Sequence, residues 1–254
     1  MNPLFRLFRR RLAPLALVAA LAGCGAAERT SADRFTATGP LIALSGGDAG
    51  AANACFTCHG LDGRGNGAGA PRLAGLGLGY LDRQLESYAN GTRRHPEMEA
   101  IAGRLDPVHR QTVSAHYAAM PFAPEPRRAP RVAPALYVAG DSDRGLPPCA
   151  ACHGLAGEGL GTANPPLGGQ PPAYLAAQMD NWRLSKRRND PGNVMLRISQ
   201  RLTPREIASL SAYAAALPGD LPRRVSRAAS PAARRDDSRN GASTPPPRGA
   251  EPGS

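Results

Sequence analysis

Two short clusters of cysteine and histidine are the residues of this chain best suited to chemistry. Residues 55–59 read CFTCH and residues 149–153 read CAACH, so both have the form C-x-x-C-H. This spacing is typical of c-type haem attachment, in which two thiols add across the vinyl groups of one porphyrin and form thioethers. The histidine after the second cysteine then becomes the proximal ligand of the iron. The predicted attachment and proximal residues are Cys55, Cys58, His59, Cys149, Cys152 and His153.

Zinc binding and disulfide exchange are the alternatives for paired cysteines. A four-cysteine zinc site usually has its C-x-x-C pairs about 15–20 residues apart and needs no histidine after each pair. Here Cys55 and Cys149 are 94 residues apart. A thioredoxin-like motif needs a strand–helix context and would leave the second copy unexplained. The pattern therefore favours two covalently attached haem c groups, each with one iron.

An internal repeat connects the two clusters. Other residues recur at the same offset of 94, and after an insertion of three residues near 184–190 the offset becomes 97. Repetition of this kind indicates duplicated structural units. The equivalent pairs include Gly60/Gly154, Gly63/Gly157, Gly65/Gly159, Pro71/Pro165, Leu73/Leu167, Tyr80/Tyr174, Gln84/Gln178, Tyr88/Trp182, Met98/Met195 and Pro107/Pro204. The glycines after each histidine are expected because the backbone must turn sharply and pass close to a flat porphyrin.

A methionine opposite the histidine would complete the coordination of each iron and close it to small ligands. Of the five methionines, only Met98 and Met195 occupy equivalent positions in the two copies. The expected axial pairs are therefore His59/Met98 and His153/Met195. The methionines set aside are Met1, Met120 and Met179.

The remaining histidines give weaker ligand candidates. His95 lies three residues before Met98 and could compete with it, and the repeat is silent here because the second copy carries its insertion in this region. His109 and His116 have no histidine counterparts in the second copy. We expect these two on the surface or in packing contacts.

The motifs together resemble the di-haem cytochrome c4 group of class I cytochromes c. The shared pattern is C-x-x-C-H-G-x-x-G-x-G, then P-x-L-x-G, then Y-L-x-x-Q, then a methionine followed by I and R-L, and it covers roughly residues 41–218. The resemblance implies an all-α fold of two tandem cytochrome c domains, with few helices around each covalently bound haem. It also implies that the carbonyls of Pro71 and Pro165 accept the Nδ1–H bonds of the two proximal histidines. One departure is that Leu76 stands where the second copy has Gln170, as the family has.

The helical pattern agrees with this fold class. Residues 80–90 place Leu81, Leu85 and Tyr88 on one helical face. Residues 107–119 and 204–217 each begin with a proline, which is favoured at a helix start because its missing N–H costs nothing there. Three helices are therefore expected in these ranges.

The N-terminus has the plan of an export signal. Residues 1–11 are basic, residues 12–23 are apolar and small, and the segment ends LAGC at Cys24. This ending resembles the lipobox of bacterial lipoproteins, so we expect a signal peptide over 1–23 and lipid on Cys24. The alternative is ordinary cleavage with an incidental thiol. Multiple acyl chains would anchor the protein stably, and residues 24–39 would form a tether.

Composition sets the remaining boundaries. Residues 121–134 (PFAPEPRRAPRVAP) predict a semi-rigid linker between a first domain at 40–120 and a second at 135–218. Residues 219–254 lack a periodic apolar face and are expected to be disordered. The net charge of +11 lies largely in the two ends, and no folded face that combines basic and aromatic residues is indicated, so nucleic-acid binding is not expected. No apolar run reaches the length of about 20 residues that a membrane-spanning helix needs.

These features predict an electron carrier rather than an enzyme. With both axial positions filled, neither iron has a place for a small-molecule substrate. The expected protein is exported, periplasmic and lipid-anchored to a membrane. It would carry single electrons from a quinol-oxidising complex or dehydrogenase to a terminal oxidase. The alternatives are a dedicated cytochrome subunit of a dehydrogenase complex and, less favoured, a di-haem peroxidase, which needs one open iron.

Overall fold

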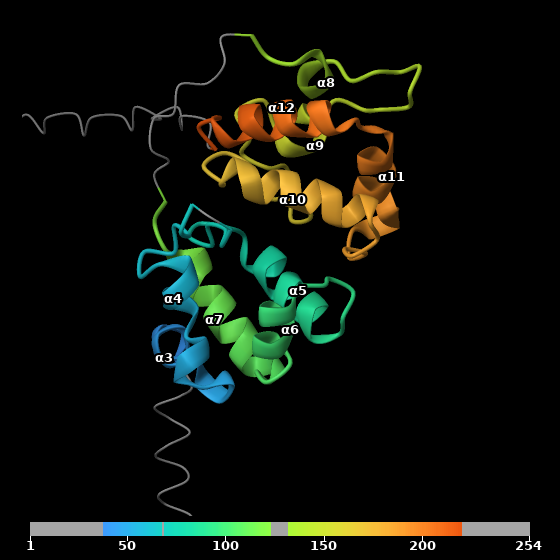
Figure 1. Ribbon diagram of the computed structural model, residues 1–254. Helices are drawn as coiled ribbons and strands as arrows, with labels where there is room; N and C mark the ends of the chain where they lie inside the picture. Colours follow the sequence, from blue (N-terminus) through green and yellow to red (C-terminus); the bar gives the residue numbers. More distant parts are fainter. Residues whose placement is uncertain (1–37, 68, 123–131, 220–254) are drawn as a thin grey trace, which may run out of the picture. The chain divides into compact units, whose positions relative to one another are not determined.

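The computed structural model describes residues 38–67, 69–122 and 132–219 (Figure 1). The predicted signal peptide, Cys24 and most of the expected tether lie outside these residues. So do the interior of the proline-rich linker, at 123–131, and the C-terminal segment from residue 220. Within the described residues no helix is long and apolar enough to cross a membrane.

The described residues form helices and connecting loops, and no strand is present among them. This agrees with the all-α fold expected from the sequence. The first copy contains α3 (Gly39–Ser45), η1 (Gly47–Ala49), η2 (Ala51–Asn53), α4 (Cys55–His59), α5 (Leu78–Ala89), α6 (Pro96–Ala102) and α7 (Pro107–Ala119). The second contains α8 (Ala135–Val138), α9 (Ala150–His153), α10 (Pro172–Arg183), η3 (Pro191–Asn193), α11 (Val194–Arg201) and α12 (Pro204–Ala215).

The first copy packs α7 against both α3 and α5. Pro107 begins α7, and the Asp106 carboxylate caps it by accepting the N–H of His109 at 2.7 Å. Such a cap satisfies one of the amides that a helix start leaves without an internal partner. The core between these helices is formed by Ile42, Ala43, Leu76, Leu81, Leu105, Val113 and Tyr117.

The second copy packs α10 against α11 and α12. Thr203 and Glu206 form a capping box at the start of α12, with each side chain accepting the other residue's backbone N–H. Tyr137 of α8 meets Tyr213 of α12 edge to face, with ring centroids 5.0 Å apart. The core here is formed by Tyr137, Leu146, Leu202, Ile207, Leu210, Tyr213, Ala214 and Leu217.

The three helices expected from the sequence are present. The helix α7 has the predicted bounds, α5 begins two residues before the predicted Tyr80, and α12 ends two residues before the predicted Leu217. Pro107 and Pro204 both stand at the helix start. Apolar spacing and proline position, both local signals, therefore predicted these helices.

The two copies also contact each other through their backbones. Arg93 and Arg187 form an isolated antiparallel bridge, in which Arg94 N–H donates to Lys186 O at 2.8 Å and Arg188 N–H donates to Thr92 O at 2.7 Å. The bridged arginines are 94 residues apart. If the first offset extends through Arg187, the insertion falls after it, within the range 184–190 expected from the sequence.

Candidate cofactor-binding sites

Each C-x-x-C-H cluster forms one short helix at the wall of its domain. In both copies the histidine is buried, with His59 7% and His153 9% exposed. The first cysteine of each pair is half-buried and the second is exposed. All four thiols are free of disulfide bonds. Each helix therefore presents two unpaired thiols and one buried imidazole, the set that covalent haem attachment uses.

A proline carbonyl orients each proximal histidine. His59 Nδ1 donates to Pro71 O at 2.9 Å, and His153 Nδ1 donates to Pro165 O at 3.0 Å. A hydrogen bond at Nδ1 leaves Nε2 as the nitrogen free to bind a metal. Burial lowers the pKa of both histidines, although the bonds to the prolines oppose this shift. The imidazoles are therefore held neutral at neutral pH, in the form that ligates iron.

The loops behind the histidines depend on glycine. Gly65 and Gly159 have φ of +80° and +76°, and each donates its N–H to the carbonyl of the proximal histidine at 2.8 Å. A Cβ at Gly65 would lie 2.4 Å from Ala70 O, and one at Gly159 would lie 2.4 Å from Asn164 O. These glycines admit the loop that carries Pro71 and Pro165, so backbone crowding is the reason for them in addition to the expected approach of a porphyrin.

The half-buried thiols are unsuited to disulfide exchange. Burial raises the pKa of Cys55, and it raises the pKa of Cys149 to about 11. Redox-active C-x-x-C motifs instead have a thiol pKa below the ordinary value, since the thiolate is the nucleophile. The environment of these cysteines therefore argues against a thioredoxin-like role.

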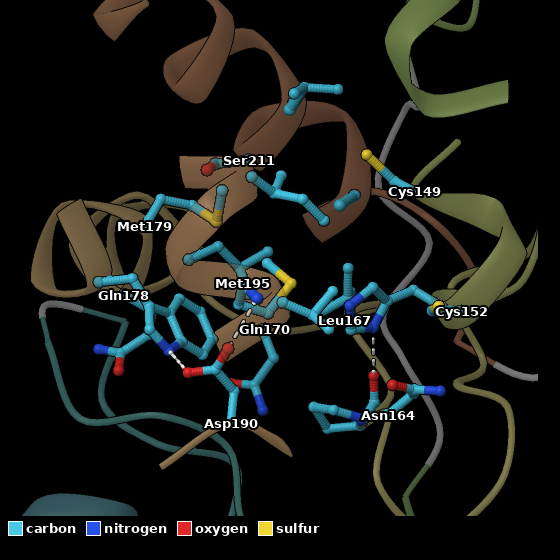
Figure 2. A pocket seen from close by; sticks show the side chains of 18 of the residues that line it. Cys149, Cys152, Asn164, Leu167, Gln170, Gln178, Met179, Asp190, Met195 and Ser211 are labelled. Atoms are coloured by element: carbon cyan, nitrogen blue, oxygen red, sulfur yellow. Dashed lines mark hydrogen bonds between the residues drawn. The ribbon is translucent and has the colours of Figure 1, made fainter. Parts of the chain in front are cut away.

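A cavity of about 320 Å³ lies in the second copy, and Tyr80, Arg83 and Gln84 of the first copy also line it (Figure 2). His153, both cysteines of the second cluster and Met195 line it, so the structure brings all the residues predicted for the second haem to one space. Its other lining residues are mostly apolar and include Leu167, Leu175, Met179, Trp182, Ile198 and Leu210.

Met195 is held in place by a carboxylate that precedes its helix. Asp190 Oδ2 accepts the Met195 backbone N–H at 2.7 Å, and Asp190 Oδ1 accepts the Trp182 Nε1–H at 2.9 Å. The Trp182 ring and Asp190 both line the cavity. Figure 2 shows the hydrogen bond between Asp190 and Met195 as a dashed line. Asp190 therefore ties the start of α11 to α10 beside the cavity.

In the first copy, Met98 lies on α6, half-buried, at the position equivalent to Met195 on α11. His95 precedes α6, and its side chain is 53% exposed with Nδ1 3.1 Å from the Glu97 carboxylate. His95 also contributes, after burial, to the lowered pKa of His59, so it acts electrostatically on the proximal ligand. His95 is therefore exposed and paired with Glu97. Met98, the repeat equivalent of Met195, stays the predicted ligand in the first copy.

The exchange of Leu76 for Gln170 has a structural reason. The Gln170 side chain forms two bonds with the backbone of Arg72 in the first copy, accepting its N–H at 3.0 Å and donating to its carbonyl at 3.0 Å. The residue equivalent to Arg72 in the second copy is Pro166, which has no N–H to donate. A glutamine at 76 could not form the reciprocal pair, and Leu76 is instead buried in the first core.

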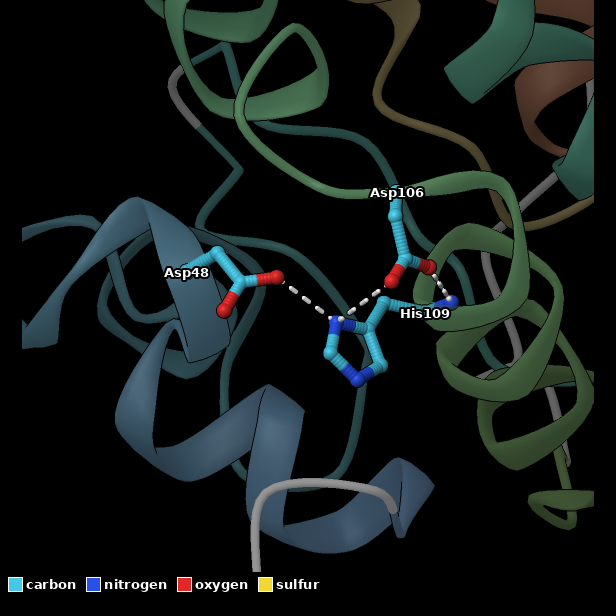
Figure 3. Close-up of side chains that lie close together, drawn as sticks. All are labelled: Asp48, Asp106 and His109. Carbon is cyan, nitrogen blue, oxygen red and sulfur yellow. Dashed lines mark hydrogen bonds and ion pairs between the residues drawn. The ribbon is translucent and has the colours of Figure 1, made fainter. Parts of the chain in front are cut away.

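His109, set aside as a ligand, belongs to an ion-pair cluster away from the haem-binding residues (Figure 3). Its Nδ1 lies 2.8 Å from Asp48 Oδ2 and 3.7 Å from Asp106 Oδ2. Asp106 is already used as the cap of α7. The cluster ties η1 to the start of α7. His116 is half-buried and its ring packs on Tyr117, with centroids 5.1 Å apart.

Three residues around the cavities were not found from the sequence. Arg93 and Arg187 could have been found, because the 94-residue offset continues to them beyond Tyr88 and Trp182. Asp190 lies in the inserted segment and has no repeat partner, so no signal pointed to it.

The residues present fit a haem group. A porphyrin needs an apolar enclosed space, two thiols, an imidazole with a free nitrogen and cations for its propionates. The second copy offers the apolar cavity, free cysteines and a buried histidine, and a buried arginine, Arg187, lines the same wall. The first copy repeats the thiols, the histidine and, at Arg93, the arginine.

Comparisons with known proteins point to one family. The family model described as Cytochrome c matches residues 45–119. The chain is 40% identical over 206 residues to the "Thiosulfate dehydrogenase electron acceptor" of Stutzerimonas stutzeri (strain A1501), covering 79% of this chain and 92% of that protein. It is 33% identical over 180 residues to the cytochrome c4 of Pseudomonas aeruginosa, covering 68% of this chain and 90% of the relative.

Solved structures give the same result. The thiosulfate dehydrogenase (TsdBA) from Marichromatium purpuratum, in its "as isolated" form, matches with a TM-score of 0.64 and 41% identity over 73% of this chain. The match spans only 41% of that longer chain. Reduced recombinant cytochrome c4 from Pseudomonas stutzeri matches with a TM-score of 0.57 and 29% identity, covering 64% of this chain and 93% of that one.

Proposed function

Because this chain belongs to the cytochrome c4-like group of di-haem class I cytochromes c, we propose that it is the electron acceptor of a thiosulfate-oxidising dehydrogenase. The chain carries two covalently attached haem c groups and transfers electrons. The choice of partner depends on one observation. The chain is 40% identical to a relative described as such an acceptor, and the match covers 92% of that relative. This makes the dedicated-subunit alternative the favoured one, ahead of a general carrier between a quinol-oxidising complex and a terminal oxidase.

The protein side of the mechanism is ligation and orientation. Cys55 and Cys58 attach the first haem, and Cys149 and Cys152 attach the second. His59 and His153 would bind the irons through Nε2, held in orientation by the proline carbonyls that accept their Nδ1–H bonds.

Met98 and Met195 would each supply the second protein ligand to an iron and so close it to small ligands. The haem supplies a one-electron couple, and methionine ligation favours the reduced form.

Closed irons argue for a carrier and against a peroxidase. Peroxidase chemistry needs an open or displaceable sixth position on one iron. A spectrum of the purified holoprotein, with carbon monoxide added after reduction, separates the two readings. The carrier predicts two low-spin haems per chain, a weak far-red band of methionine-ligated ferric iron, and no change with the gas. A haem that binds the gas or is high-spin would contradict the assignment of methionine as the ligand at that site.

The partner is tested by enzyme-dependent reduction. Oxidised holoprotein is mixed with thiosulfate and a purified thiosulfate dehydrogenase, and haem absorbance is followed with time. We expect reduction of both haems only when the dehydrogenase is present. A chain that the dehydrogenase leaves oxidised, but that a quinol-oxidising complex reduces, would instead be the general carrier.

We also propose that the mature chain is periplasmic and anchored through lipid on Cys24. Haem c is attached outside the cytoplasm, so the chain must be exported, and the N-terminal pattern is that of an export signal. Membrane fractionation of the natural chain and of Cys24→Ser tests the anchor. The proposal expects the natural chain in the membrane fraction and the variant in the soluble periplasmic fraction.

A further inference from the structure

The contact between the two copies contains a symmetric pair of buried arginines. Arg93 and Arg187 occupy equivalent repeat positions, face each other across the backbone bridge, and are each only 4% exposed. Each guanidinium lies over an aromatic ring of its own copy, Arg93 over Tyr88 at 4.6 Å and Arg187 over Trp182 at 4.0 Å. These rings are themselves repeat equivalents. We call Arg93 and Arg187 the arginine pair.

The side-chain partners of the arginine pair are all neutral. Arg93 donates to Gln84 at 2.9 Å, to the Tyr174 hydroxyl at 2.9 Å and to Gln178 at 2.7 Å. Arg187 donates to the same two glutamines, at 3.0 Å to Gln84 and 2.9 Å to Gln178. Two positive charges thus share the same two amide oxygens. Arg187 also donates to the Tyr80 hydroxyl at 3.3 Å and to the Asn189 side chain at 3.0 Å.

No carboxylate balances this charge among residues 38–67, 69–122 and 132–219, where neither arginine takes part in an ion pair. Removing a charged side chain from water costs several kcal/mol unless an opposite charge compensates. Burial alone would raise the pKa of Tyr80, yet Arg187 and Arg93 lower it, which shows the positive potential at this place. The arrangement is complete only with an anion.

The anion must come from the side of the cofactor cavity. Arg187 lines the cavity together with Gln84, Gln178 and both tyrosines of the cluster, on the same cavity surface that holds His153 and Met195. Figure 2 shows Gln178 beside the part of the cavity that contains Met195. Haem c is apolar except for its two propionate carboxylates, and arginine binds carboxylates through a planar two-pronged contact.

We propose that the arginine pair binds the propionates of the two haems and raises both reduction potentials. A nearby positive charge disfavours the ferric state, which has one more positive charge than the ferrous state. Because the two arginines share Gln84 and Gln178, a change at either one also acts on the haem of the other copy. This inference depends on the two haems and is independent of the identity of the redox partner.

The first test removes one charge from the pair. In holoprotein with two haems per chain by pyridine haemochrome assay, Arg187→Gln is compared with Arg188→Gln by spectroelectrochemical titration. Arg188 is the adjacent residue, is exposed, and gives the same change in net charge. We expect Arg187→Gln to shift the ferric–ferrous equilibrium of the second haem at least tenfold towards ferric, about 59 mV for one electron. The first haem should shift in the same direction by less, and Arg188→Gln should move either haem less than threefold.

Equal shifts in the two variants would overturn the proposal, since a purely structural arginine would act no differently from a surface charge. If Arg187→Gln does not assemble with two haems, Gln178→Glu gives the second test. It adds a carboxylate where both arginines already donate, so it competes with the propionates for their charge. We expect both haems to shift at least threefold towards ferric relative to Gln200→Glu, an exposed change of equal charge on α11. Potentials that match those of Gln200→Glu would overturn the proposal.

Discussion

Asp190 is the residue that distinguishes the two methionine-bearing helices. In the first copy, the backbone N–H of His95 donates to Glu99, a residue of α6 itself, at 2.8 Å. In the second copy, Asp190 lies before α11 and joins the backbone of Met195 to the ring of Trp182. The carboxylate at the start of α11 thus also bonds to the neighbouring helix α10, whereas the carboxylate that caps α6 belongs to α6.

Replacing Asp190 with asparagine should loosen Met195. Hydrogen bonds to a charged acceptor contribute about 1.5–3 kcal/mol, and the amide retains only one acceptor oxygen for two donors. We expect a weaker far-red methionine–iron band and a second haem that binds carbon monoxide when reduced. The control is Asp180→Asn, an exposed carboxylate on α10. If the far-red band stays intact and the haem merely shifts towards ferrous, Asp190 acts as a charge and not as a positioning residue.

Gln170 and Leu76 predict an asymmetric response to exchange. Gln170→Leu leaves the buried backbone N–H and carbonyl of Arg72 without their partners, which should cost about 1–3 kcal/mol of unfolding free energy. Leu76→Gln should also destabilise, because Pro166 offers no N–H for the reciprocal bond. Urea unfolding of the holoproteins measures both, with Leu76→Met as a volume-conserving control. A stabilising Leu76→Gln would show that the copies are interchangeable here.

At the scale of elements, α12 is stabilised by a carboxylate at its start. Arg144 lies 2.7 Å from Glu206, and together with the backbone N–H of Thr203 it holds the pKa of Glu206 at about 2. The ordinary value is 4.5. A carboxyl whose pKa is depressed on folding adds stability above the unfolded value and loses it as the pH falls. This contribution should therefore disappear between about pH 4.5 and pH 2.

Glu206→Gln should lower the unfolding free energy by about 1 kcal/mol at pH 7, a magnitude set by capping at a solvent-exposed site. Near pH 2.5 the natural carboxyl is largely protonated in the unfolded chain, and the gap between the two proteins should shrink. Urea unfolding at both pH values measures this, with the exposed Asp143→Asn as the control. A gap that is the same at both pH values would mean that Glu206 acts through packing alone.

The helices were predictable because their signals are local. The prolines at 107 and 204 and the apolar spacing of 80–90 determine α7, α12 and α5 without reference to the rest of the chain. The repeat predicts the insertion near residues 184–190, and the bridge between Arg93 and Arg187 narrows it to the residues after Arg187. The burial of a polar residue between the two copies cannot be recognised from the spacing of apolar residues.

At the scale of the molecule, the site residues that local motifs carry could be predicted, and those that depend on contacts between the two copies could not. The thiols, histidines and methionines follow from spacing and repetition, because each copy carries them within its own sequence motif. The contacts of Gln170 with Arg72, and of Arg93 with Tyr174, join residues 98 and 81 positions apart. Such pairs depend on how the copies meet, which a single sequence does not contain.

The whole molecule is also expected to depend on its haems for folding. Each copy has a core of only seven or eight buried hydrophobic residues, and the second surrounds a cavity of about 320 Å³ with apolar walls. Small domains bury a smaller fraction of their surface and are only marginally stable, and a group bound only by the folded state adds directly to stability. Without the porphyrins, the apolar cavity walls would have nothing to pack against and the buried arginine pair would lack an anionic partner.

Chain produced without haem attachment should therefore lack most of the helical circular dichroism of the holoprotein and be cleaved rapidly by protease. The comparison uses the same sequence matured with both haems, so no substitution complicates it. A haem-free chain with helix content and protease resistance equal to the holoprotein would show that the two small cores suffice. In that case the apolar cavity would be a preformed site, and haem attachment would follow folding instead of completing it.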